Sequence, residues 1–300
     1  MQLDPVFDGP GRFLKGNLHT HSNLSDGARS QEAVCEAYAG GGYDFLALTD
    51  HFLAKYSFPI ADTRHFRRPG FTTLLGAEVH APRNSQGEVW HILAVGLPPG
   101  FAPTAAAETG PALAQRCLEA GAFVAIPHPG WSGLTLEDAR SLPGIHAVEI
   151  HNHTSHVLTD RGDGRYLIDA MLCDGRLPGI IATDDAHFHA RDWFGAWVMV
   201  RAEHNEPETL LAALKAGHCY ASEGPRLEAI LWSEDQVEIR CSPAATIMAL
   251  GRASRAVQVC GEGLTRATLP LDRLRPGGFA RVVVADAAGK RAWGGARWLG

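Results

Sequence analysis

Seven apolar runs in the first two-thirds of this chain end in, or lie beside, His, Asp or Glu residues. They occupy residues 17–21, 46–51, 74–78, 91–96, 124–128, 147–151 and 180–187. A barrel of parallel strands places its C-terminal strand ends, and the reactive groups on them, at the face where the loops gather. Imidazoles and carboxylates that meet at such a face can share several divalent metal ions. The pattern therefore predicts a metal site assembled from many strand ends.

The first 225 residues alternate between apolar segments of strand length and segments that carry helix start and stop signals. This alternation is typical of an α/β fold with a parallel sheet or barrel. Ser30, for example, is suited to cap a helix that the glycines at 40–42 would end. We expect strands at 13–18, 45–48, 73–77, 90–96, 123–126, 147–150 and 179–183, and helices at 30–39, 109–120, 165–173 and 207–216.

After Gly224 and Pro225 the hydrophobic period changes to two, which is typical of strands. Residues 1–225 hold 16 Lys and Arg against 26 Asp and Glu, whereas residues 226–300 hold 11 against 7 and no His. We therefore predict a metal-binding domain over 1–225 and a small antiparallel β-sandwich domain over 226–300. The tail could be a dimer surface, a lid or a carbohydrate-like binding module, and the sequence leaves these alternatives open. If it is a dimer surface, the protein forms a homo-oligomer. Its expected strands are 227–231, 237–241, 247–250, 256–260, 266–269, 281–285 and 291–299.

Composition excludes several classes of protein. The net charge is −6 and Lys and Arg form no large cluster, so we expect no nucleic-acid partner. No apolar run approaches the roughly 18 residues of a membrane span, and no export signal is recognisable, so we expect no membrane partner and a cytoplasmic location. The six scattered cysteines form no CxxC motif and are expected to be reduced thiols.

His-x-His pairs alone are weak evidence for a metal site. About one such pair is expected by chance in a chain of this length with 15 histidines. The pair His19 and His21 stands out because both residues follow an expected strand, and Asp26 adds a carboxylate in the same loop. The other two pairs are 151/153 and 187/189.

Other strand ends supply further candidate ligands. His51 follows an apolar run, and the preceding Asp50 could orient a ligating imidazole or cap a turn. Glu78 ends an otherwise apolar strand, where a carboxylate is costly unless it is paired or metal-bound, and it could bridge two cations. His91 precedes its apolar run instead of following it, so its position gives the weakest support among these residues for a role as metal ligand. The remaining candidates are His128, which prolines flank on both sides, and Asp185 and His187.

Taken in order, these motifs resemble those of the PHP (polymerase and histidinol phosphatase) superfamily over about residues 12–225. They are His19-Thr20-His21, Ser25-Asp26-Gly27, Thr49-Asp50-His51, Gly76-Ala77-Glu78, His91-Ile92-Leu93, His128-Pro129 and Asp185-Ala186-His187. The resemblance implies a distorted, seven-stranded, TIM-like (β/α) barrel with a two- or three-metal centre at its C-terminal rim. The segments 15–21, 220–225 and 286–293 are similar to the CehA/McbA-like metallohydrolase branch. His80 and Glu223 depart from that branch, since we expect small residues at both positions.

The resemblance also distributes the ligands over three metal ions, which it allows to be zinc, manganese or iron. Asp26 stands where many relatives carry histidine. The implied ligands are His19, His21, Glu78 and Asp185 for the first ion, Glu78, His91 and His128 for the second, and Asp26, His51 and His187 for the third.

Such a centre predicts a hydrolase in which a metal-bridged hydroxide is the nucleophile. The predicted catalytic residues are Glu78, Asp185 and His187. The leading hypothesis is a phosphoesterase acting on a small organic phosphate, and the alternative is a carboxylic or carbamate ester hydrolase with the same centre. A non-catalytic binding or scaffolding barrel is a third hypothesis, against which the complete ligand set argues. Candidate substrate-binding residues are His153, Arg161 and Arg191. The alternative for the two arginines is that they are solvated surface residues.

Overall fold

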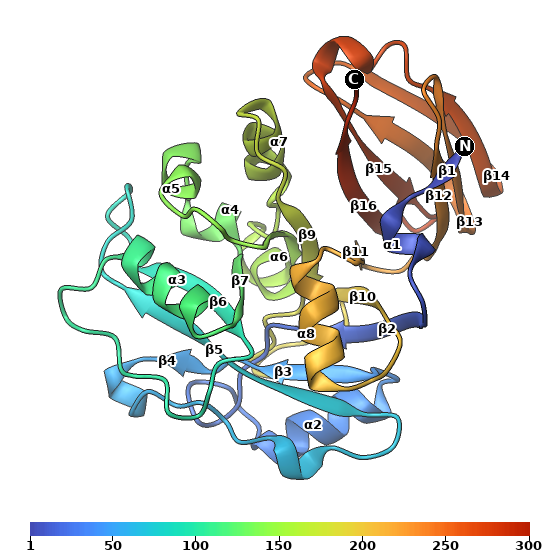
Figure 1. Cartoon of the computed structure of the whole chain (residues 1–300). Coiled ribbons are helices and arrows are strands. Elements are labelled where there is room, and N and C mark those ends of the chain that lie inside the picture. The colour runs from blue at the N-terminus through green and yellow to red at the C-terminus, as the bar shows by residue number, and fades with distance from the viewer.

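The computed structural model describes residues 1–300, with a larger α/β part and a smaller part built of strands (Figure 1). The larger part contains β2 (Arg12–Asn17), β3 (Phe45–Leu48), β4 (His51–Phe52), β5 (Thr72–Ala81), β6 (Trp90–Val95), β7 (Phe123–Ile126), β8 (Ala147–Asn152), β9 (Gly179–Thr183), β10 (Trp197–Ala202) and β11 (Cys219–Ser222). Its helices are α2 (Gln31–Gly40), α3 (Gly110–Glu119), α4 (Pro129–Ser132), α5 (Leu136–Arg140), α6 (His153–Thr159), α7 (Arg165–Cys173) and α8 (Pro207–Lys215). The smaller part contains β1 (Gln2–Leu3), α1 (Pro5–Asp8), β12 (Leu227–Trp232), β13 (Gln236–Leu250), β14 (Ala256–Pro270), β15 (Phe279–Ala285) and β16 (Arg291–Trp298).

The sheet of the larger part is mixed. Its strands follow the order β11-β10-β2-β3-β5-β6-β7-β8-β9. β2, β3 and β5 run parallel, and so do β7, β8 and β9. A parallel bridge between Thr20 and Ala186 joins the chain just beyond β2 to the chain just beyond β9. The ligand-bearing segments that follow β2 and β9 therefore lie side by side, although five strands separate β2 from β9 in this order.

β6 corrects the expectation of a purely parallel arrangement, because it runs antiparallel to both β5 and β7. Only residues 82–89 connect β5 to β6, which is too short for a crossover helix and suits a hairpin. The beginning of β6 therefore lies beside the end of β5. This direction explains how His91, which precedes its apolar run, still reaches the edge where the other candidate ligands gather.

The four predicted helices form close to the expected ranges, and side-chain caps fix the starts of α2 and α3. The Ser30 side chain accepts a hydrogen bond from the backbone N–H of Ala33, and Thr109 does the same for Ala112. The short helices α4, α5 and α6 and the strands β4, β10 and β11 were not predicted, since each is too short or too mixed in polarity for a clear period. None of the helices combines the length and apolar character that a membrane crossing would need.

The smaller part is antiparallel, with β13 pairing to β12, β14 and β15. Here the sequence pattern was wrong in detail: the expected strands 237–241 and 247–250 are one strand, β13, and 256–260 and 266–269 are likewise one strand, β14. The pairing of β13 with β14 shifts register between Arg240 and Ala244 and again before Thr246. Pro243 lies in this irregular stretch, and such bulges interrupt the alternation from which strands are predicted.

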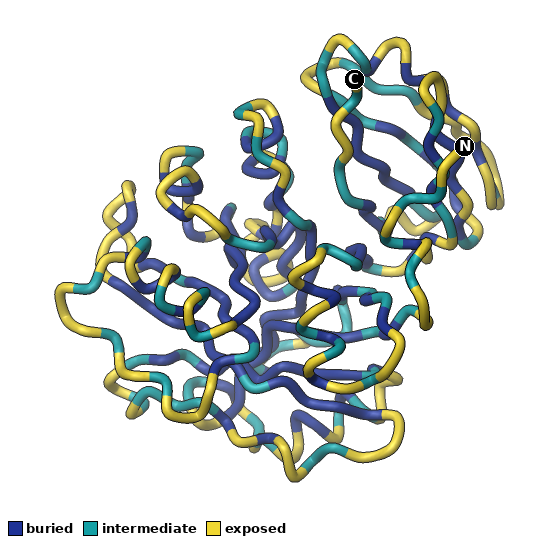
Figure 2. Tube along the Cα trace, in the orientation of Figure 1, coloured by how far each residue is buried: buried dark blue, intermediate teal, exposed yellow.

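The two parts pack against each other, and buried residues run through both (Figure 2). Phe279, Val283 and Trp293 of the tail belong to the same apolar core as residues of β8 and β9. The first residues of the chain pair with the tail, since β1 is antiparallel to β12 and Phe7 packs in the core of the smaller part (Figure 1). The chain is thus a mixed α/β protein whose N-terminal segment lies against its C-terminal strands.

Candidate metal centre

Strand geometry brings four polar side chains to one face of the β4-β5-β6 sheet. Glu78 and His80 are two residues apart on β5, so both project from the same face. In the pairing register His80 lies opposite His91 of β6, and His51 of β4 lies opposite Glu78. Directly paired residues share a face, so all four point toward the same space.

A second group comes from the two segments joined by the bridge between Thr20 and Ala186. The backbone N–H of His21 donates to the carbonyl of Ala186, and that of Asp185 donates to the carbonyl of His19. This register aligns His19 and His21 with Asp185. His21 Nε2 lies 2.9 Å and His19 Nε2 3.2 Å from Asp185 Oδ1.

The backbone is strained at two of the candidate ligands. Asp185 has a φ of 58° and His128 a φ of 27°, in the region that non-glycine residues rarely adopt. Such strain persists only where the surrounding structure enforces it, and it concentrates at functional sites. Both side chains are nevertheless buried, and both are directed at the group around Glu78.

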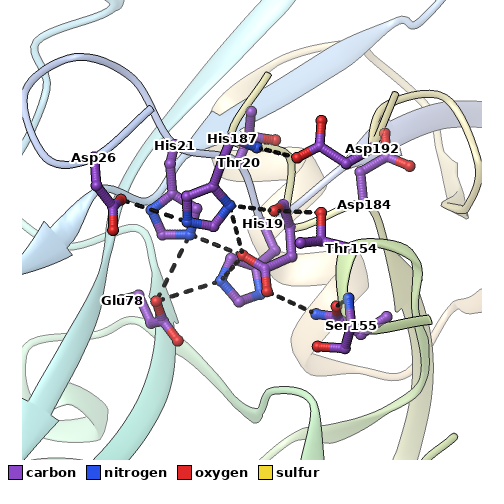
Figure 3. Close-up of polar contacts among 12 residues, drawn as sticks. His19, Thr20, His21, Asp26, Glu78, Thr154, Ser155, Asp184, His187 and Asp192 are labelled. Atoms are coloured by element: carbon purple, nitrogen blue, oxygen red, sulfur yellow. Dashed lines mark hydrogen bonds and ion pairs between the residues drawn. The ribbon is translucent and has the colours of Figure 1, made fainter. Parts of the chain in front are cut away.

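Glu78 is fully buried and lies close to several imidazoles of the cluster, and Figure 3 shows it beside His19 and His21. Its Oε1 atom lies 2.7 Å from His91 Nδ1 and 3.0 Å from His128 Nε2. Its Oε2 atom lies 3.6 Å from His19 Nε2 and 3.7 Å from His21 Nε2. One carboxylate therefore faces two sets of imidazoles, as a bridging ligand would.

The open end of the cluster is formed by Asp26, whose side chain is 40% exposed. Its carboxylate oxygens lie 3.4 Å from His51 Nε2 and 3.4 Å from His187 Nε2. The ring of His187 stacks on that of His21 at a centroid distance of 4.2 Å. This group is the third candidate ligand set, and it is the most accessible to solvent.

The donor atoms fit a set of divalent ions. All nine predicted ligands, together with His80, fall into four groups whose ligand atoms lie within 4.8 Å of one another. His19 Nε2, His21 Nδ1 and Glu78 Oε2 are buried without any hydrogen-bond partner, although other polar atoms lie close to them. Unpartnered polar atoms are costly in a protein interior unless something else satisfies them. Mixed imidazole and carboxylate donors suit zinc, manganese and iron alike.

The charges of the cluster are strongly coupled. Burial alone would lower the pKa of His19 and His51, but Asp185 and other carboxylates raise that of His19 well above its usual value, and Glu78 and its neighbours raise that of His51 to about 10. Burial and neighbouring imidazoles lower the pKa of His21 to about 3. Although burial opposes it, the surrounding histidines hold the pKa of Glu78 and Asp185 well below the usual range. The carboxylates are thus ionised, and protons on His19 and His51 occupy the place that cations would take.

Glu149, on β8, supports the cluster and was not predicted. It is fully buried, and its Oε1 atom accepts hydrogen bonds from His19 Nδ1 at 2.8 Å and from the Thr183 hydroxyl at 2.6 Å. Its Oε2 atom accepts from the backbone N–H of His128 at 2.7 Å and from Asn152 at 2.9 Å. A carboxylate that fixes two ligand-bearing segments sets the direction of their donor atoms. The sequence signal that could have pointed to Glu149 is the same as for Glu78: a carboxylate within an otherwise apolar strand.

Asp50 orients a loop, not an imidazole. Its carboxylate accepts from the backbone N–H and hydroxyl of Ser22 and from the hydroxyl of Ser25. Of the two roles open from sequence, the structure therefore supports the turn. His51 instead makes its Nδ1 hydrogen bond with His80.

A cavity of about 240 Å³ opens onto the cluster and is lined by Asp26, His51, His91, His128, Trp131, Ser155, Asp185 and His187. None of the predicted substrate-binding residues lines it. Arg161 and Arg191 are exposed, and the ring of His153 packs against Gly195, where a Cβ would lie 2.2 Å from it. Two further wall residues, Trp131 and Ser155, lie on the short helices α4 and α6, which the sequence pattern did not predict.

Glu223, the second departure from the family pattern, lies in a separate cavity of about 270 Å³ between the two parts of the molecule. Its Oε1 atom is 3.4 Å from His151 Nε2 and 4.0 Å from Lys290 Nζ. The turn before β16 forms the opposite wall. Glu223 therefore does not line the cavity at the metal cluster.

Comparison with known proteins adds one local sequence match. No family model matches the chain. A segment of 101 residues is 36% identical to a phosphoribosyl 1,2-cyclic phosphate 1,2-diphosphodiesterase of Eggerthella lenta. The match covers 33% of this chain and 37% of that protein, so the chain matches little more than a third of its relative.

Among solved structures, the chain resembles a two-domain protein from Bacteroides vulgatus that contains a predicted PHP-like metal-dependent phosphoesterase. The TM-score is 0.56 at 17% identity, over 90% of this chain and 89% of the other. An amidohydrolase from Chromobacterium violaceum gives a TM-score of 0.43 at 18% identity, over 59% and 89%, which is too low to bear on the fold. The first comparison shows a shared fold: this chain has the mixed α/β fold of that two-domain protein, and the expected resemblance is confirmed at the level of the fold.

Proposed function

We propose that this chain is a metal-dependent phosphoesterase that releases phosphate from a small organic phosphate. The observation that carries the proposal is the convergence of nine candidate ligands around the buried carboxylate of Glu78. The shared fold with a PHP-like protein and the local match to a cyclic-phosphate diesterase support it. The motifs at 220–225 and 286–293 further favour the CehA/McbA-like branch.

Two or three divalent ions, zinc, manganese or iron, would occupy the cluster. Bound there, they would lower the pKa of a shared water molecule and hold the attacking and leaving oxygens in place. The residues that would hold them are His19, His21, Glu78 and Asp185 for the first, Glu78, His91 and His128 for the second, and Asp26, His51 and His187 for the third.

The chain's own groups would orient the substrate and move protons. Trp131 forms one wall of the cavity beside His91 and His128, with ring centroids 5.4 and 5.1 Å away. His187 lies at the accessible end, and although burial opposes it, Asp26 and Asp185 raise its pKa. With only two ions bound, we assign His187 as the group that protonates the leaving oxygen, while Glu78 and Asp185 keep the ions in position.

A carboxylic or carbamate ester is the second candidate substrate, and one observation favours it. No Arg or Lys is among the eight residues that line the cavity, so a phosphate would depend on the ions for its charge neutralisation. A neutral ester makes no such demand.

The experiment that tests the proposal is metal analysis of the purified protein followed by two substrate panels. We expect at least two tightly held ions per chain, and manganese- or zinc-dependent phosphate release from aryl phosphates that Glu78→Gln abolishes. His204→Ala, on an exposed histidine, is the matched control. Phenol release from aryl esters without phosphate release would favour the alternative, and a chain that binds no ion would leave only the scaffold hypothesis.

The organisation of the molecule is part of the proposal. We propose that residues 1–225 are a distorted seven-stranded PHP barrel and that 226–300 are a β-sandwich domain, with the bridge between Thr20 and Ala186 and the antiparallel pairs of the tail as support. The segment 2–8 would belong with the tail. Six cysteines without disulfide partners suit the cytoplasm. The cavity volume suits a small-molecule substrate, and a homo-oligomer formed through the tail is an open extension.

A further inference from the structure

His80 is a buried imidazole at the edge of the cluster, in a position where we expected a small residue. The residue is 4% exposed and projects from β5 on the same face as Glu78. Its ring lies 4.4 Å from that of His91 and 4.8 Å from that of His51, measured between centroids. Its Nδ1 atom is buried without a partner, and its Nε2 atom contacts His51. Packing alone does not account for a histidine with one unpartnered nitrogen and one aimed at a candidate ligand.

The two ring nitrogens of His51 face different surroundings. Nε2 lies 3.4 Å from Asp26, in the accessible ligand group that includes His187. Nδ1 points the other way and makes a hydrogen bond of 2.8 Å with His80 Nε2. Nδ1 also lies 2.7 Å from Glu78 Oε2, a close contact between charged groups, but Oε2 has no hydrogen-bond partner.

A neutral imidazole can bind a cation through only one nitrogen, and a hydrogen bond at the other nitrogen decides which. We propose that His80 is a positioning residue: its Nε2 accepts the Nδ1 proton of His51 and so directs the Nε2 lone pair of His51 toward the ion held with Asp26 and His187. This inference rests on the proposed metal centre and adds to it a residue that none of the expected ligand sets contains.

The neighbouring groups leave this role to His80. The carboxylate of Asp50, which the sequence offered for it, is fully engaged with Ser22 and Ser25. Oε1 of Glu78 faces His91 and His128, and Oε2, although it is 2.7 Å from His51 Nδ1, makes no hydrogen bond with it. A metal-bound histidine usually donates its second N–H to a carboxylate or carbonyl, so a neutral imidazole in this place is a weaker acceptor and makes His51 a weaker ligand. The accessible ion should therefore be the one most easily lost.

The test uses the full chain labelled with ¹⁵N-histidine and loaded with ¹¹³Cd²⁺. Long-range ¹H–¹⁵N spectra of the wild-type protein should show His51 with a proton on Nδ1 and a ¹¹³Cd coupling on Nε2, and His80 with no coupling to ¹¹³Cd. In His80→Ala, one ion should bind about 10- to 100-fold more weakly in chelator competition, while the other ions keep their affinity. His80→Gln, which offers an amide oxygen as acceptor, should bind that ion with most of the wild-type affinity.

The control is His204→Ala, which should leave all affinities unchanged. A ¹¹³Cd coupling to either nitrogen of His80 would make it a ligand and overturn the proposal, as would a His51 ring protonated on Nε2. An unchanged affinity in a folded His80→Ala would also overturn it. Because the wild-type spectra need no variant, the proposal is tested even if that variant does not fold. Absence of all bound cadmium would instead overturn the metal centre itself.

Discussion

Replacing Glu149 with Gln should separate metal affinity from folding stability. The four hydrogen bonds that Glu149 accepts come from partners of two kinds. The backbone N–H of His128 and the amide of Asn152 can only donate here, so the Gln oxygen must face them. The new NH₂ group then faces His19 Nδ1 and the Thr183 hydroxyl, and both of these can accept a hydrogen bond. Every contact survives if His19 gives up its Nδ1 proton and keeps a proton on Nε2.

The substitution therefore keeps the hydrogen-bond pattern of the metal-free protein but leaves His19 in a form that cannot bind an ion. All four charge-assisted hydrogen bonds of Glu149 become neutral ones, which should lower the free energy of unfolding by about 2–4 kcal/mol. His19 Nε2, however, is the nitrogen that faces Asp185 and Glu78, and once protonated it cannot bind an ion. We expect the affinity for the ion held by His19 to fall about 10- to 100-fold, or roughly 1.4–2.8 kcal/mol.

The assay is chelator competition for metal affinity, alongside urea unfolding of the metal-free protein. Thr183→Val is the matched control, because it removes a hydrogen bond to the same oxygen and leaves the tautomer of His19 unchanged. It should cost about 1 kcal/mol of stability and leave metal affinity within about threefold of wild type. A Glu149→Gln protein that binds every ion as tightly as the wild type would refute the reasoning.

Three further predictions concern protons, packing and the ions themselves. Because the raised pKa of His51, about 10, keeps it protonated near pH 7, zinc binding should release protons, and calorimetry in buffers of different ionisation enthalpy should detect this. In the metal-free protein the stability that His51 contributes is fully present below its unfolded pKa of about 6.5 and is lost as the pH rises toward 10, so urea midpoints should fall over that range. Asp169→Asn leaves the nearly buried Arg281 without its carboxylate partner and should lower the free energy of unfolding by about 1–2 kcal/mol, after allowance for the partly exposed Asp169, whereas Glu36→Gln on the surface should have no measurable effect. Removal of bound ions by a chelator should lower the thermal midpoint, by an amount that grows with the free ion concentration before removal.

Much of the ligand set could be found from sequence because strand ends are local. Glu78 and His128 each follow a short apolar run that predicts a buried strand, where a polar group is costly without a partner, although β5 continues beyond Glu78 to Ala81. The same reasoning supported His91 less strongly as a metal ligand, because spacing alone does not show in which direction a strand runs. Its place became clear only from the hairpin that reverses β6.

The supporting residues and the pocket walls were harder to predict, for a different reason. Glu149 and His80 act through hydrogen bonds to residues far away in the chain, and no period in the sequence encodes such pairs. Trp131 lies on a single-turn helix that only tertiary contacts stabilise. Arg161 and Arg191 are exposed and do not line the cavity at the metal cluster, so their role in substrate binding stays a prediction.

The pairing of β1 with β12 has a practical consequence for taking this molecule apart. Phe7 fills the core of the smaller part, and the indole N–H of Trp232 donates to Asp4. A fragment cut near residue 225 would carry the C-terminal strands without the segment that closes them. Its stability should return only when residues 2–8 are supplied again, for example by fusing them ahead of residue 226 through a flexible linker.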